Sequence, residues 1–210
     1  MFVHSIREDW ERLWQKRFHI DTPRLRFELG GEELSNLTQQ IPRFLQAHSR
    51  STAIVRACMP DETLAIVGWY PGKLLKTIGI ERSKNGFDAL FKTGFEGELV
   101  AEWQAYPYRD PDDDEPSCWS YKCYTLDKER VALDTLIWHA VANEMPIYPS
   151  LPLQVFLLDQ KYSVLVHIYD DRGMDVIADQ ASALTPLYRR FSGWLLDFDR
   201  PRMARIFEGG

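Results

Sequence analysis

The sequence has no uncharged apolar run long enough to cross a membrane, and its start does not resemble a secretory signal. Arg7, Glu8 and Asp9 interrupt the first residues before an apolar stretch of signal-peptide length can form. Cysteine is also scarce: the 210 residues contain three, an odd number that does not suit a framework of disulfides. We therefore expect a cytoplasmic protein with no membrane partner.

Positive charge is in short supply as well. Lysine and arginine number 25 against 31 aspartates and glutamates, which gives a formal net charge of -6. A general nucleic-acid-binding protein would carry a basic stripe instead. The charge balance therefore argues against a direct nucleic-acid partner and favours a basic molecule as any charged partner.

The motifs of common catalytic and cofactor-binding folds are missing. The glycines form neither a P-loop nor a dinucleotide fingerprint, and Ser192 has one of the two glycines of a nucleophile elbow. The five histidines are widely spaced, and Cys118 and Cys123 would face opposite sides of an expected strand. Neither a metal site nor a cofactor is therefore predicted, and Cys58, at the end of an expected helix, should be an inert thiol.

The sequence also allows the alternative hypothesis that the protein is an enzyme. His139 on an expected helix and His167 on an expected strand could meet in space, and either could act with a carboxylate such as Asp170 in a small hydrolase of unrecognised type. A lone histidine beside aromatic residues is, however, more often a packed, hydrogen-bonded side chain. Because no coherent set of nucleophile, base and orienting group is visible, we predict that the protein is not an enzyme and keep the hydrolase as the alternative.

What the sequence does have is a large apolar fraction, 45% hydrophobic and 13% aromatic, which is enough for a packed core. Helical spacing of apolar residues, with Asp127 as one cap, predicts helices, and alternation predicts strands. The expected helices cover about residues 5–18, 37–58, 83–95, 128–145, 179–196 and 200–207. The expected strands cover about residues 24–29, 63–70, 97–108, 117–126, 153–159, 162–169 and 173–178.

The last three expected strands are joined by connections too short for helical crossovers, so they should form an antiparallel meander. The turn Asp170-Asp171-Arg172-Gly173 between the final two has the residues of a type I turn followed by a glycine at positive φ. Its neighbouring carboxylates should point apart and stay solvated, rather than converge as a general acid/base pair. We predict a single α+β domain over residues 1–210, with a mainly antiparallel sheet whose C-terminal three-stranded meander packs against several helices.

The C-terminal stretch "YDDRGMDVIADQASALTPLYRRFSGWLLDFDRPRMARIF" resembles the signature of an uncharacterised bacterial family, a domain of unknown function. Members of that family end in a similar DDRG-M-DVIA hairpin, an LY-containing helix and a W-(I/L)-LD-(Y/F)-DR segment. The strand "LRFELG" resembles the N-terminal part of the same family. The resemblance implies a small bacterial cytosolic protein of one domain, and it carries over no activity and no catalytic residue.

The segment "YPYRDPDDDEPSCWSY" is the most site-like part of the sequence, because five carboxylates fall within six residues and aromatic residues flank them. It is either a solvated hairpin loop or a docking surface with rigid aromatic anchors in a negative field. We predict that it binds a protein partner through Tyr108, Asp110, Asp112, Asp113, Asp114, Glu115, Trp119 and Tyr121.

The preferred hypothesis is thus a non-enzymatic interaction protein, in the manner of an immunity protein or antitoxin that neutralises a basic toxin. A plain structural or regulatory subunit would have the same sequence features, and the two remain open at this point.

Overall fold

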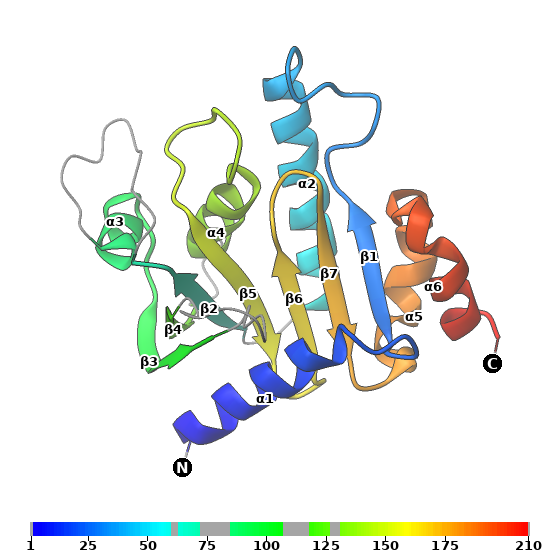
Figure 1. The fold of residues 1–210 in the computed structure, drawn as a ribbon, viewed down its shortest axis with the longest axis horizontal. Coiled ribbons are helices and arrows are strands. Elements are labelled where there is room, and N and C mark those ends of the chain that lie inside the picture. The colour runs from blue at the N-terminus through cyan, green and yellow to red at the C-terminus, as the bar shows by residue number, and fades with distance from the viewer. Residues whose placement is uncertain (1, 60–62, 72–84, 107–117, 127–130, 210) are drawn as a thin grey trace.

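The computed structural model describes residues 2–59, 63–71, 85–106, 118–126 and 131–209. The acidic segment 109–116 and the expected cap Asp127 lie outside the described residues. Within these ranges the fold is α+β, as predicted, and a seven-stranded sheet organises it (Figure 1).

The predicted elements are present with shifted bounds. The helices are α1 (Phe2–Lys16), α2 (Gln40–Cys58), α3 (Gly86–Lys92), α4 (Val131–Val141), α5 (Ala181–Arg190) and α6 (Arg200–Phe207), with short 3-10 helices η1 (Ser192–Trp194) and η2 (Asp197–Asp199). The strands are β1 (Arg24–Glu28), β2 (Leu64–Trp69), β3 (Glu98–Ala105), β4 (Trp119–Thr125), β5 (Leu153–Asp159), β6 (Val164–Ile168) and β7 (Gly173–Ala178). The helix expected over residues 179–196 ends at Arg190, because the chain continues from there as the 3-10 helix η1.

The sheet has the order β1-β7-β6-β5-β2-β4-β3, and every described pair is antiparallel. The predicted meander of β5, β6 and β7 is confirmed. The strands on either side of the acidic segment, β3 and β4, pair with each other. The sequence did not indicate that β1 lies beside β7, or that β2 lies between β5 and β4.

The two faces of the sheet carry separate cores. Helices α2, α4 and α5 cover one face, while α1 crosses the other, as the view in Figure 1 shows. Residues of the central strand β6 alternate between them: Val164 and Val166 belong to the larger core, and Leu165 to the core under α1. The α1 helix is anchored by Trp10, whose ring centroid lies 4.7 Å from that of Tyr121.

The outer edge of β1 is occupied by the chain that follows η1. The Leu196 N–H donates to the Arg26 carbonyl (2.9 Å), and a single bridge joins Phe27 to Leu195. Asp199 then pairs with Arg202 at 2.7 Å, and this ion pair fixes the start of the last helix.

Candidate functional site

The turn between β6 and β7 is structural, but its carboxylates are not solvated as predicted. Asp170 is 2% exposed and Asp171 is 6% exposed, since each carboxylate is bound by an arginine. Asp171 forms an ion pair with Arg43 of α2, and Arg43 also donates to the backbone oxygens of Gly31 (2.6 Å) and Leu34 (2.8 Å). Burial of both charges is tolerated because an opposite charge and further hydrogen bonds accompany them.

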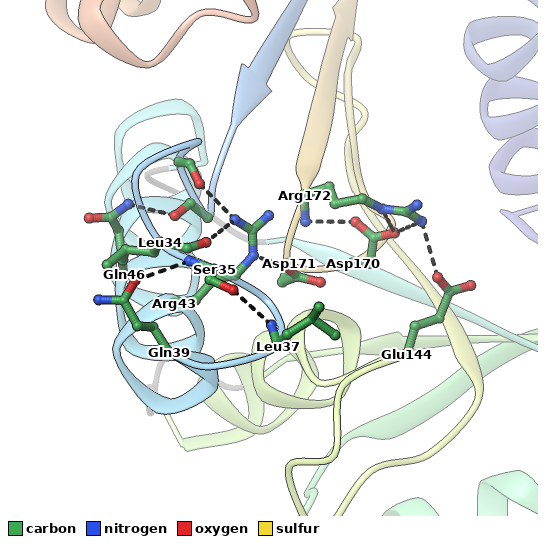
Figure 2. A network of polar contacts seen from close by, with 12 residues as sticks. Leu34, Ser35, Leu37, Gln39, Arg43, Gln46, Glu144, Asp170, Asp171 and Arg172 are labelled. Carbon is green, nitrogen blue, oxygen red and sulfur yellow. Dashed lines mark hydrogen bonds and ion pairs between the residues drawn. The ribbon is translucent and has the colours of Figure 1, made fainter.

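Asp170 turns the other way, toward Arg172. Its Oδ1 accepts the Arg172 backbone N–H (2.7 Å), and its Oδ2 accepts from the Arg172 Nε (2.7 Å). The same guanidinium reaches the Glu144 carboxylate at 3.1 Å, as Figure 2 shows. The two neighbouring carboxylates therefore point apart, as predicted.

Gly173 does not have the predicted positive φ, which among the described glycines occurs at Gly31 and Gly94. The space that a side chain at Gly173 would need is instead occupied by neighbouring atoms. A Cβ atom there would lie 2.6 Å from the Phe27 carbonyl oxygen and 2.4 Å from the Tyr169 Oη. Glycine is therefore required by close packing of β1 and of the Tyr169 ring, and not by a left-handed backbone.

A cavity of about 270 Å³ lies between this turn and the start of β4. Its polar and aromatic lining comes from four segments far apart in the chain: Trp119, Asn143, Glu144, Gln154, His167 and Tyr169. The ion pair of Arg172 with Glu144 ties the rim of the cavity to the turn described above. Glu144 also has a φ of 67°, an uncommon backbone conformation for a residue other than glycine.

His167 is the buried polar group of this cavity. Its ring stacks on Phe156 with a centroid distance of 4.4 Å and meets the edge of Trp14 at 4.7 Å. Burial, with a smaller contribution from the nearby Arg17 charge, lowers the pKa of His167 to about 3. The imidazole is therefore neutral at physiological pH.

Tyr169 and Asp175 lie beside His167 on the same face. Burial, followed by the Asp175 charge, raises the pKa of Tyr169 above its ordinary value. Burial also raises the pKa of Asp175, although Arg24 and Arg26 oppose that shift. The Arg26 Nε donates to the Asp175 Oδ1 at 3.3 Å, so this carboxylate is held by an arginine rather than by His167.

Two of the residues predicted to bind a partner are described, and both are largely buried. Tyr121 is 0% exposed, with its hydroxyl donating to the Gln154 Oε1 at 2.7 Å. Trp119 is 7% exposed and lines the cavity. The other predicted residues lie outside the described part of the chain: Tyr108, Asp110, Asp112, Asp113, Asp114 and Glu115.

The expectation that His139 and His167 could meet is wrong, because the sheet separates them. His139 belongs to α4, which packs on the face opposite α1, and its Nε2 lies 2.9 Å from the Thr93 Oγ1. Burial lowers its pKa to about 4. The carboxylate in register with His167 is Asp175, and not Asp170, whose oxygens are bound by Arg172.

The described residues contain no cluster of three or more side chains suited to holding a metal ion. They also include no helix of sufficient length and apolarity to span a membrane. Burial raises the pKa of Cys58 to about 12, in agreement with the inert thiol expected there.

The cavity itself was not predicted from the sequence. Asn143, Glu144 and Gln154 gave no signal, since they come from a loop and a strand that look ordinary on their own. His167 was the available clue, because it is the one titratable residue of the apolar strand "VLVHI".

Comparison with known protein families matches residues 2–199 to DUF3885, described as a domain of unknown function. No curated protein and no solved structure matches the chain. The match extends well beyond the C-terminal stretch that carried the resemblance in the sequence. The chain therefore belongs to the DUF3885 family.

Proposed function

We propose that this protein binds and neutralises a basic protein partner, in the manner of an immunity protein or antitoxin. The observation that carries the proposal is the position of Trp119. This residue follows the acidic segment 109–116 closely in the chain and lines the cavity together with Glu144. A negative segment and a pocket for an anchoring side chain are the two components that a small docking surface requires.

The charge of the chain supports a basic partner. The formal net charge is -6, and five carboxylates lie within residues 110–115. Such a field raises the rate of encounter with a positively charged protein and opposes encounter with nucleic acid.

The chemistry of the cavity favours binding over catalysis. A general base needs an oriented imidazole, usually fixed by a carboxylate. The carboxylate in register with His167 is committed to Arg26, and the Asp170 carboxylate is committed to Arg172. Because an imidazole with a pKa of about 3 is a weak base, His167 is better suited to recognition than to proton transfer.

The test is capture of the partner from the native host with tagged protein, followed by kinetic measurement with the purified partner. Wild type is compared with a variant in which four carboxylates are neutralised: Asp112→Asn, Asp113→Asn, Asp114→Asn and Glu115→Gln. The expected result is a basic protein whose association rate with the variant is roughly tenfold slower at low salt, with the difference disappearing at high salt.

A matched control uses the opposite end of the β3–β4 hairpin. The double variant Glu96→Gln, Glu98→Gln removes two exposed charges there and should bind as wild type does. It is compared with the double variant Asp112→Asn, Asp113→Asn. A captured partner without net positive charge, or equal binding by both double variants, would refute the proposal. Relief of growth inhibition by co-expression would identify the partner as a toxin.

A further inference from the structure

We propose that the cavity beside His167 receives an uncharged side chain carrying a hydrogen-bond donor, namely a tyrosine of the protein partner. The inference rests on the proposed function in one respect: that the tyrosine belongs to a protein partner. Recognition of the phenol group follows from the cavity itself.

The size of the cavity suits one side chain. Its volume is about 270 Å³, which is below the range of roughly 300–1,000 Å³ that is typical of small-molecule sites. Apolar contact is supplied by Pro152, and aromatic contact by Trp119 and Tyr169, whereas the Leu153 and Ile168 side chains belong to the core on the other face of the sheet. An aromatic ring would therefore find matching walls.

The charged groups around the cavity are already neutralised by one another. Glu144, the one charged residue among the described residues that line the cavity, is bound by Arg172 at 3.1 Å in an exposed ion pair, and Asp175, beside His167 in the sheet, is bound by Arg26 at 3.3 Å. A cationic or anionic ligand would have to break one of these pairs or remain uncompensated. The exposed Arg172–Glu144 pair contributes little to this preference. Within the described part of the chain, the buried end of the cavity, at His167, offers no charged partner, and this disfavours an arginine, lysine or carboxylate there.

His167 supplies the polar recognition. The residue is 7% exposed, and among the described residues neither of its ring nitrogens has a hydrogen-bond partner. These nitrogens are not among the fully enclosed polar atoms, so the imidazole edge reaches the cavity that the ring lines. A neutral imidazole has one acceptor nitrogen, which matches the O–H of a phenol. Burial keeps the ring in that neutral form by lowering its pKa to about 3.

The experiment titrates the purified protein with N-acetyl-tyrosinamide and follows the imidazole ¹⁵N resonances of His167. A saturable shift is expected. N-acetyl-phenylalaninamide lacks the hydroxyl and should bind roughly three- to tenfold more weakly, the value of one neutral hydrogen bond. N-acetyl-argininamide should produce no saturable shift.

Two variants separate recognition from folding. His167→Phe keeps a ring stacked on Phe156 and should remove the preference for the tyrosine probe over the phenylalanine probe. His48→Phe, on α2, makes the same substitution at another imidazole that contacts aromatic neighbours, and it should leave the preference unchanged. Thermal unfolding confirms that both variants fold.

An unchanged His167 resonance at saturating probe, or tighter binding of the arginine probe, would overturn the inference. So would a tyrosine preference that survives in His167→Phe. These outcomes do not depend on the acidic segment, so the basic-partner proposal would stand or fall separately in its own kinetic test.

Discussion

Lowering the pH from 7 to 5 should destabilise the folded protein, because two of its histidines are buried in the neutral form. His139 is 0% exposed, and burial lowers its pKa to about 4. His167 is 7% exposed and has a pKa of about 3 for the same main reason. Both values lie below the 6.5 of a histidine in the unfolded chain. Between these limits the unfolded chain binds protons that the folded chain does not, so acid favours unfolding.

The size of the effect follows from proton linkage. Between pH 7 and pH 5, each histidine should lower the free energy of unfolding by about 2 kcal/mol. His139 and His167 lie on opposite faces of the sheet, so their contributions should add to about 4 kcal/mol. That is a large part of the roughly 5–15 kcal/mol that stabilises a typical domain.

Urea unfolding at pH 7, 6 and 5, followed by tryptophan fluorescence, measures this effect. Asp175 complicates the wild-type curve: burial raises its pKa, so its contribution to stability is present in acid and is lost as the pH rises. The quantity to compare is therefore the free energy of unfolding of wild type minus that of each variant, His139→Gln or His167→Phe. Because the variant lacks the buried histidine, this difference should fall by about 2 kcal/mol from pH 7 to pH 5. Replacement of His19, an exposed residue, serves as the control. A difference that stays constant with pH would refute the buried neutral state of that histidine.

Further predictions concern packing and charge. Gly173→Ala should lower the free energy of unfolding by about 2 kcal/mol, because the new Cβ would meet the Phe27 carbonyl oxygen; equal stability in urea would contradict this. Arg43→Met should cost about 3 kcal/mol by leaving the Asp171 carboxylate buried and unpaired, and adding Asp171→Leu should restore part of the loss in a double-mutant cycle. Cys123, 0% exposed with a pKa raised to about 12 by burial, should react with a thiol reagent only after unfolding; rapid labelling of the native protein would argue against that burial.

Much of the fold could be predicted from the sequence, because short connections and periodic apolar residues are local signals. The β5–β7 meander is the clearest case, since its turns leave no room for a crossover. The pairing of β1 with β7 could not be predicted, because no local pattern in "RLRFELGG" indicates which strand it will join.

The turn at Asp170 and Asp171 shows where local reasoning ends. Its sequence predicts a turn correctly, and nothing near it indicates that Asp171 will be buried against Arg43, 128 residues away. The cavity, too, could not be predicted from local sequence. Trp119, Glu144 and His167 come together through the sheet order, and that order is itself a long-range property.

The position of β1 also has a consequence for synthesis of the protein. Among the described strands, β1 pairs with β7 alone, with Arg24 opposite Ile177. On the ribosome, β1 is synthesised well before β7, so its backbone and its Leu25 and Phe27 side chains remain without their β7 partners until β7 has been translated. During that interval the nascent chain exposes an unpaired strand that chaperones could bind and that other chains could join. Completion of the sheet therefore waits for the translation of β7, and a chain that stops before β7 would leave β1 unpaired at that edge.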